Sequence, residues 1–179
     1  MRSASPERGL RRRLVAYSRL AVLVMMVPAC AGAILVAVAV DRGLGRSPMR
    51  GWGRRTQAVS CALLLRCCAV RVERDARELP SGPMLLACNH VSWLDIIVLA
   101  RFWPVRFLSK QDVARWPVIG RAATSLGTLY LERGRREASE QALVAMRDSL
   151  RAGDAVLFFP EATTSAGDRI LPFRARLFQ

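Results

Sequence analysis

The sequence predicts an α/β fold, a layered sheet flanked by helices, with a membrane-associated helical segment at the N-terminus. From residue 84 onward, short apolar runs alternate with longer segments of helical period, which is typical of layered α/β domains. Residues 20–40 form 21 positions without a charge, long enough to cross a bilayer core as a helix. The length of 179 residues suits one domain with a membrane appendage.

The N-terminal part of the chain divides into two expected regions. Residues 1–19 are polar and arginine-rich, and we expect them to form a loose basic arm. Residues 20–70 contain the apolar segment, interrupted by Pro28 and Gly32, and are expected to be a membrane-associated helical region. A cleaved signal peptide is the alternative, but its apolar body is ordinarily shorter than this one.

Arginine dominates the charge of the chain. The net charge is +14, and residues 1–55 hold 11 arginines and only two acidic residues. This placement suits anionic lipid head groups better than a nucleic-acid groove, and no RNA-binding or zinc-finger pattern is present, so we expect membrane lipids and no nucleic acid as partners. Arginines flank both ends of the apolar segment, which favours a hairpin or monotopic helix over a single span followed by an interfacial helix.

The cysteines and the single histidine limit the metal and redox chemistry. No two cysteines form a C-x-x-C pair, and all of them lie in apolar surroundings, so they are read as small buried side chains in a reducing compartment. One histidine without paired thiols gives no basis for a metal site, and none is expected. The five cysteines are Cys30, Cys61, Cys67, Cys68 and Cys88.

Residues 71–179 are expected to form the domain that carries the chemistry. Its apolar runs are bounded by glycine, proline and polar clusters, and its helical segments place apolar residues three and four apart. Strands are predicted at Met84–Cys88, Val105–Ser109, Gly127–Leu131 and Ala155–Phe159, and helices at Leu94–Arg101, within Asp112–Leu126 with an interruption at Pro117, and at Glu137–Arg151.

The most informative stretch runs from Cys88 to Asp95, where a predicted strand leads into a predicted helix. His90 is the only histidine, and Asp95 follows it by five residues. A carboxylate beside a histidine fixes the tautomer and stabilises the imidazolium that forms when the other ring nitrogen takes a proton. Five residues exceed the spacing of one helical face, so the pair would have to meet through a loop. The alternative is that His90 satisfies a turn and Asp95 merely opens the helix.

Four sequence blocks resemble those of the glycerolipid acyltransferases, the 1-acylglycerol-3-phosphate acyltransferase family. They cover about Met84–Phe178, in the order that the family shows. There are two departures: Ala162 replaces the usual glycine of the third motif, and no fourth motif precedes Gln179, so we expect a fragment or a C-terminally short member. The blocks are Asn89-His90-x-x-x-x-Asp95, a linking block with Ser109-Lys110 and Trp116–Gly120, Gly127–Arg133 with Glu132 where aspartate is usual, and Phe159–Ser165.

The resemblance implies a reaction. A fatty acyl group would pass from acyl-CoA or acyl carrier protein to the free hydroxyl of a lysophospholipid, first of all 1-acylglycerol-3-phosphate, giving phosphatidic acid. The family needs no cofactor beyond this co-substrate, and it implies phospholipid biosynthesis at the cytoplasmic face of the cell inner membrane. Two alternatives stay open: acylation of lyso-ornithine lipid or another lysolipid, and a non-catalytic membrane-bound fragment.

The predicted site combines a base with a substrate-binding set. His90 is expected to be the general base and Asp95 to orient it. No G-x-S-x-G elbow is present, and Ser92 is read as a helix-capping residue rather than a nucleophile. Basic residues at strand ends are expected to bind the anionic group of the acceptor, although they could instead be solvated surface residues. Residues of the third block are expected to contact the acceptor, although this block could instead be an ordinary polar turn. The expected substrate-binding residues are Arg133, Lys110, Glu161, Thr163 and Thr164.

Overall fold

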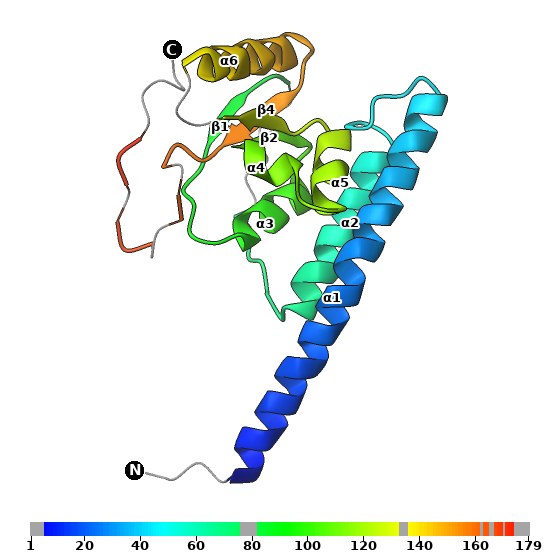
Figure 1. Cartoon of the computed structure of the whole chain (residues 1–179), viewed down its shortest axis with the longest axis vertical. Coiled ribbons are helices and arrows are strands. Elements are labelled where there is room, and N and C mark those ends of the chain that lie inside the picture. Colours follow the sequence, from blue (N-terminus) through cyan, green and yellow to red (C-terminus); the bar gives the residue numbers. More distant parts are fainter. Residues whose placement is uncertain are drawn as a thin grey trace.

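The structure is a computed structural model of the whole chain, with a helical hairpin beside an α/β unit (Figure 1). It describes residues 6–75, 82–132, 136–161, 163–164, 167–169 and 171–173. The fold class predicted from the sequence is confirmed, because a parallel sheet with helices on both faces follows an apolar N-terminal helix.

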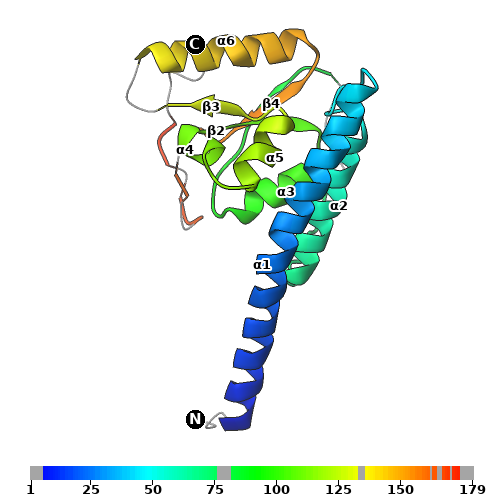
Figure 2. The ribbon, with the colours of Figure 1, turned by 45° about the vertical axis from the view of Figure 1, so that its right-hand side comes forward.

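The hairpin consists of α1 (Pro6–Gly43) and α2 (Trp52–Cys67), which pack side by side (Figures 1 and 2). Two expectations about this region are wrong. Residues 6–19 are not a loose arm but part of α1, because their arginine, leucine and alanine residues favour a helix that simply continues into the apolar segment. Pro28 does not interrupt α1 either, and the chain reverses at residues 44–51 instead.

A buried carboxylate joins the two helices of the hairpin. Asp41, in the last turns of α1, accepts hydrogen bonds from the backbone N–H groups of Trp52 at 2.9 Å and Gly53 at 2.7 Å. These are among the first N–H groups of α2, which have no partner within their own helix. A side chain on Gly51 would collide with the Asp41 carboxylate, so the glycine permits this close approach.

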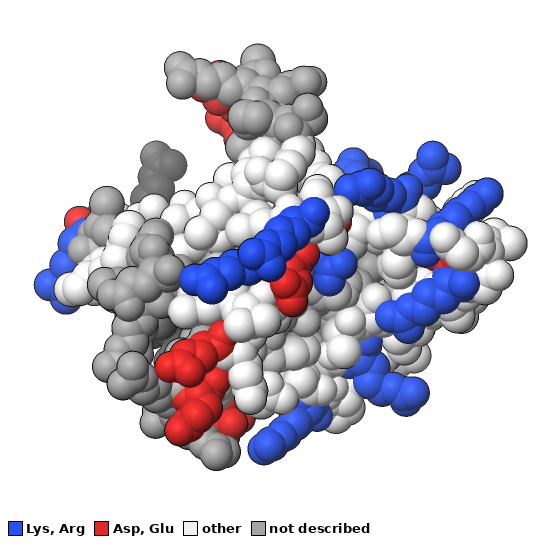
Figure 3. All heavy atoms as spheres, turned by 90° about the horizontal axis from the view of Figure 1, so that it is seen from above, with Lys and Arg blue, Asp and Glu red and all other residues white. Residues whose placement is uncertain are grey.

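The arginines of the hairpin gather at its two ends. Five arginines occur between residues 42 and 55, and basic side chains dominate this end of the molecule when it is seen from above (Figure 3). The arginines at residues 11–13 belong to the other end of α1. At 1.5 Å per residue, roughly 45 Å of continuous helix separates the two groups.

The two halves of α1 have different surroundings. The segment Arg13–Gly43 is long and apolar enough to cross a membrane. Its C-terminal half nevertheless packs on the α/β unit, and Arg42 donates a hydrogen bond to the Ser125 carbonyl oxygen at 3.2 Å. Large apolar side chains of the N-terminal half, from Leu14 to Met25, are exposed. The packed cluster is formed by Ala31, Ile34, Val38, Met49, Ala122 and Leu126.

The sheet has four parallel strands in the order β1-β4-β2-β3. Every strand and helix predicted for residues 84–159 is present, with ends that differ by a few residues, and the interruption at Pro117 separates α4 from α5. The strands are β1 (Leu85–Ala87), β2 (Val105–Lys110), β3 (Leu129–Leu131) and β4 (Ala155–Phe158), and the helices are α3 (Leu94–Phe102), α4 (Gln111–Ala114), α5 (Ile119–Ser125) and α6 (Arg136–Arg151).

Helices cover both faces of the sheet, as Figure 2 shows. Alternate residues of β4 point to opposite faces. Val156 and Phe158 pack with Met146 of α6, whereas Leu157 packs with Ala100 of α3 and with Cys61 of α2. The hairpin therefore contributes to the same core that holds the sheet.

The parallel arrangement brings the ends of distant segments to one edge. His90 follows β1, Lys110 ends β2, and Phe159 follows β4. Because the carboxyl ends of parallel strands share one edge of a sheet, residues from three of the four sequence blocks meet there.

Candidate active site

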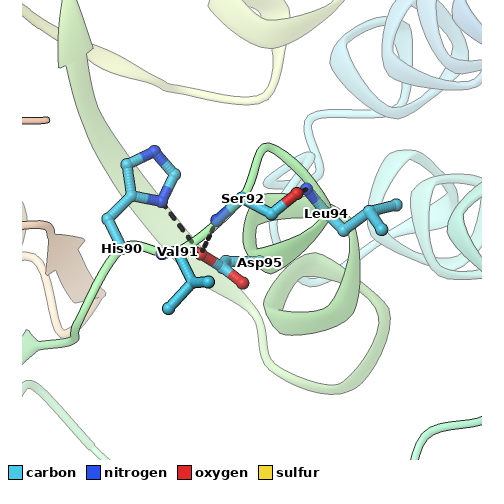
Figure 4. A network of polar contacts seen from close by, with 5 residues as sticks. All are labelled: His90, Val91, Ser92, Leu94 and Asp95. Carbon is cyan, nitrogen blue, oxygen red and sulfur yellow. Dashed lines mark hydrogen bonds and ion pairs between the residues drawn. The ribbon is translucent and has the colours of Figure 1, made fainter. Parts of the chain in front are cut away.

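The site begins with the loop between β1 and α3. Nδ1 of His90 lies 3.0 Å from Oδ2 of Asp95 (Figure 4). Asp95 is in the first turn of α3, so the loop folds back far enough to bring the two side chains together across five residues. The expected contact between them is therefore present, and Asp95 both opens the helix and holds the histidine.

The same carboxylate oxygen holds the loop in shape. Oδ2 of Asp95 also accepts hydrogen bonds from the backbone N–H groups of Val91 at 2.8 Å and Ser92 at 2.9 Å (Figure 4). The Ser92 hydroxyl in turn accepts a hydrogen bond from the Leu94 N–H at 3.3 Å, but the N-cap position of α3 is occupied by Trp93 and not by Ser92 as expected. One carboxylate oxygen thus receives two backbone N–H groups and faces the histidine, which fixes the path of the loop. These backbone contacts are not visible in the sequence motif.

The geometry assigns different roles to the two nitrogens of His90. An ionised Asp95 only accepts hydrogen bonds, so Nδ1 carries the proton that it donates. Nε2 then holds the free lone pair, and it points away from Asp95 (Figure 4). The side chain of His90 is 16% exposed, so it is largely buried but keeps some access to its surroundings. This is the arrangement that a general base requires.

Phe159 supports the imidazole ring from the neighbouring strand. The two rings stack with centroids 4.0 Å apart and planes inclined by 18°. The sequence alone does not predict this contact of Phe159, because nothing in one sequence shows that β1 and β4 are neighbours. An aromatic residue directly before Pro160-Glu161 at a strand end was the available signal.

A cavity of about 320 Å³ opens in front of His90. Its polar lining includes Lys110, Ser109 and Thr164, so the structure brings two of the predicted substrate-binding residues to the histidine. The remaining lining is apolar, as a site for a hydrocarbon chain requires. It is formed by Trp93, Ile96, Phe107, Leu108, Val113, Trp116, Leu131, Phe158 and Phe159.

Two predicted residues of the third block lie outside this lining. Thr163 is exposed to solvent. Glu161 is only 5% exposed, and both of its carboxylate oxygens are buried without a hydrogen-bond partner among the described residues. Burying a carboxylate without hydrogen-bond donors is unfavourable, so a bound molecule that donates hydrogen bonds would stabilise Glu161. Arg133, the main candidate for the anion site, lies outside the residues that the structure describes.

The cysteine beside the site is poorly suited to covalent chemistry. Burial raises the pKa of the Cys88 thiol above its ordinary value, and the nearby Asp95 carboxylate raises this pKa further. The thiolate is the nucleophilic form, so a thiol with a raised pKa stays protonated near neutral pH. Within the described part of the chain, no group of three His, Cys, Asp or Glu residues is placed to hold a metal ion.

A second cavity, of about 350 Å³, lies at the opposite edge of the sheet. Its lining includes Arg50 of the hairpin bend and the residues that precede β2 and β4, such as Pro104 and Asp154. None of the predicted site residues belongs to it.

Comparison with known proteins places these features in a family. The sequence model of the Acyltransferase family matches residues 69–179. The chain is 44% identical over 110 residues to the 1-acyl-sn-glycerol-3-phosphate acyltransferase of Neisseria gonorrhoeae, covering 62% of this chain and 43% of that protein. It is 38% identical over 128 residues to the lyso-ornithine lipid O-acyltransferase of Brucella abortus, covering 72% of this chain and 48% of that protein. The chain thus spans less than half the length of these curated relatives.

The fold has a solved counterpart as well. The crystal structure of the 1-acyl-sn-glycerophosphate (LPA) acyltransferase from Thermotoga maritima superposes with a TM-score of 0.68 at 21% sequence identity, covering 93% of this chain and 67% of that chain. At this identity the likeness concerns the fold. The resemblance expected from the motifs is confirmed by the family match, which covers more than half of the sequence, and the chain belongs to the glycerolipid acyltransferase family.

Proposed function

We propose that this chain transfers a fatty acyl group from an acyl thioester to the free hydroxyl of a lysolipid. The observation that carries the proposal is the His90–Asp95 pair, because it leaves Nε2 of His90 free and His90 lines a largely apolar cavity. A hydroxyl is a poor nucleophile at neutral pH unless a base removes its proton during the attack. Histidine is the side chain that most often serves as a general base, and His90 is the only histidine in the sequence.

The reaction that this geometry supports proceeds by direct attack. Nε2 of His90 takes the proton from the acceptor hydroxyl as its oxygen bonds to the thioester carbonyl carbon. The tetrahedral intermediate then breaks its C–S bond, and the departing sulfur takes the proton from the imidazolium. Asp95 keeps Nδ1 protonated and stabilises the imidazolium between these two steps. The raised pKa of Cys88 supports this direct route over one through a thiolate nucleophile.

The acceptor is held by polar groups at the edge of the cavity. Lys110 lies at the end of β2 and lines the cavity with Thr164, so we assign it to the acceptor's anionic head group. Glu161 lies outside the cavity lining, but its two buried oxygens lack donors among the described residues, and we propose that acceptor hydroxyls supply them. Arg133 and Thr163 join this set on the strength of the motif resemblance.

Lysophosphatidic acid is the acceptor that we propose first, giving phosphatidic acid as the product. The 44% identity to a 1-acyl-sn-glycerol-3-phosphate acyltransferase supports it. Lyso-ornithine lipid is the second candidate, because proteins named lyso-ornithine lipid O-acyltransferase match a larger share of the chain, 72% in one case. In that case the cations would meet the carboxylate of the ornithine head group rather than a phosphate.

We place the reaction at the cytoplasmic face of the inner membrane. Acyl-CoA and acyl carrier protein, the proposed donors, are cytoplasmic, whereas the lysolipid lies in the leaflet. The exposed apolar side chains of the N-terminal half of α1 support contact with that leaflet. Each arginine near an anionic surface adds about 1 kcal/mol of attraction, so the arginines at residues 11–13 of this half strengthen the contact.

The test is a product analysis by mass spectrometry. The purified chain is incubated with acyl-CoA or acyl carrier protein and with a panel that contains lysophosphatidic acid, lyso-ornithine lipid and neutral lysolipids. We expect phosphatidic acid as the main product, at a rate that depends on His90. Acylated ornithine lipid as the main product would favour the second candidate, and the absence of transfer to every lysolipid would contradict the proposal.

A further inference from the structure

The exposed apolar side chains of the α/β unit are concentrated at one place. Nine large hydrophobic residues within the described part of residues 82–173 are exposed, and six of them belong to the loop before α3, the first turn of that helix, and the turn between α4 and α5. Exposed apolar groups that gather in this way mark a contact surface, whereas isolated ones need no explanation. We call these six the apolar rim: Val91, Trp93, Ile96, Trp116, Val118 and Ile119.

The apolar rim borders the mouth of the candidate active site. Trp93, Ile96 and Trp116 line the same cavity as His90, and the other three rim residues are exposed without lining it. The two indole side chains remain 58% and 52% exposed, for Trp93 and Trp116 respectively. In Figures 1 and 2 both rim segments lie on the lower side of the α/β unit, the side on which the N-terminal half of α1 extends.

The turn between α4 and α5 is shaped to project its apolar residues outward. Val118 has φ 61° and ψ −57°, and the Ile119 N–H donates a hydrogen bond to the Pro117 carbonyl oxygen at 2.6 Å, which makes this a γ-turn. Positive φ is unfavourable for a β-branched residue. Behind the turn, a side chain on Gly120 would collide with the backbone of α4, so the close packing there fixes the turn from inside.

The charges around this turn suit an anionic surface. Exposed arginines, Arg115 and Arg121, stand on either side of the apolar residues. No acidic residue occurs between Asp112 and Glu132. Tryptophan with flanking arginine is the composition found where proteins meet the head-group region of a bilayer.

We infer that the apolar rim is a second membrane-contact surface, by which the α/β unit itself enters the head-group region of an anionic leaflet. The mouth of the cavity then faces the leaflet, and a lysolipid reaches His90 without leaving the membrane. The inference extends the proposed function, since that function supplies the membrane-borne acceptor. The end of the hairpin that carries Trp52 lies on the far side of the molecule and stays in water.

The four tryptophans of the chain provide the test. Three variants each keep one of Trp52, Trp93 and Trp116 and replace every other tryptophan with phenylalanine. Each is bound to phosphatidylglycerol-containing vesicles in which part of the lipid carries brominated acyl chains, which quench tryptophan at short range. Trp52 is the matched control, because it is 52% exposed, as Trp116 is, but begins α2 at the bend of the hairpin.

We expect brominated lipid to reduce the emission of Trp93 and Trp116 and to leave that of Trp52 unchanged. Quenching of Trp52 without quenching of the other two would mean that the hairpin alone lies on the membrane, and it would overturn the inference. Equal quenching of all three would overturn it as well. If the protein binds vesicles but Trp93 and Trp116 are not quenched, the rim does not contact the membrane and is free to bind another protein. This result would contradict the inference. None of these readouts requires catalytic activity, so they stand apart from a failure of the proposed function.

A second variant examines the consequence for catalysis. The double variant Val118→Gly/Ile119→Ser removes two apolar rim side chains that do not line the cavity, and glycine adopts the positive φ at position 118 without strain. The apparent KM for a vesicle-embedded lysolipid should rise about tenfold, the effect of losing roughly one buried apolar side chain. Turnover of the same lysolipid dispersed in detergent should stay unchanged. An unchanged KM on vesicles would count against the rim as a contact.

Discussion

The imidazole ring of His90 lies flat against the ring of Phe159, with 4.0 Å between their centroids. The two residues are 69 positions apart in the sequence, and the pairing of β1 with β4 brings them together. Asp95 holds the same imidazole through Nδ1. Two contacts from different segments therefore fix both the position and the rotation of the proposed base.

The stacking contact predicts a positioning role for Phe159. Phe159→Leu removes the aromatic face and lets the imidazole rotate, so kcat should fall about 2- to 10-fold, as expected for an aromatic pair worth ~0.5–1.5 kcal/mol. Phe159→Tyr keeps the ring and should retain most of the activity. Steady-state kinetics of both variants, with their melting temperatures, provide the check. A Phe159→Leu variant with wild-type kcat would remove Phe159 from the site.

The three hydrogen bonds to Asp95 separate its catalytic role from its structural one. Asp95→Asn keeps an acceptor oxygen for the Val91 and Ser92 N–H groups but loses the charge that stabilises the imidazolium. We expect kcat to fall by roughly 10²–10⁴ with little change in melting temperature.

Asp95→Ala is the paired variant, because it leaves both N–H groups without their acceptor. It should lose activity and also roughly 1–3 kcal/mol of stability. Thermal unfolding alongside turnover distinguishes the two substitutions. Equal stability of both variants would show that the carboxylate does not organise the loop.

Glu161 should show opposite effects on stability and activity. Its buried carboxylate has no donor among the described residues, so Glu161→Gln removes an unfavourable buried charge. The melting temperature should stay equal or rise, while kcat/KM for the acceptor falls about tenfold or more through the loss of charge-assisted hydrogen bonds to its hydroxyls. Unchanged acceptor kinetics would place Glu161 outside the substrate site.

Asp41 is expected to clamp the hairpin. Asp41→Ala leaves the N–H groups of Trp52 and Gly53 without their acceptor inside the structure, so the melting temperature should fall by several degrees. Asp148→Ala is the matched control, since Asp148 is an exposed carboxylate on α6, and it should have almost no effect. Scanning calorimetry compares the two. Similar melting temperatures for both variants would contradict the clamp.

The sequence predicted the α/β unit well because its signals are local. Apolar runs and helical periods lie within single elements, so each element between residues 84 and 159 could be placed, including the break at Pro117. The structure of the hairpin was harder to predict from the sequence. Pro28 suggested an interruption, yet one missing N–H in a long helix, with a ring that faces the exposed side, does not stop α1.

The site was predictable only in part for the same reason. His90 and Asp95 lie five residues apart, so their contact could be predicted from a loop that leads into a helix. The stacking of Phe159 and the clamp between Asp41 and Gly53 depend on which elements become neighbours in space. The strand order β1-β4-β2-β3 determines the stacking of Phe159 on His90, and the chain reversal at residues 44–51 determines the contact between Asp41 and Gly53. Neither can be read from the residues of one segment.

The turnover of a His90→Ala variant tests the central claim most directly. Purified wild-type and variant chains are compared with acyl-CoA and lysophosphatidic acid, after vesicle binding and melting temperature show that both are folded and membrane-bound. Loss of the general base should lower kcat by roughly 10²–10⁴ while vesicle binding stays unchanged. A His90→Ala chain that transfers acyl groups at the wild-type rate would contradict the proposed mechanism.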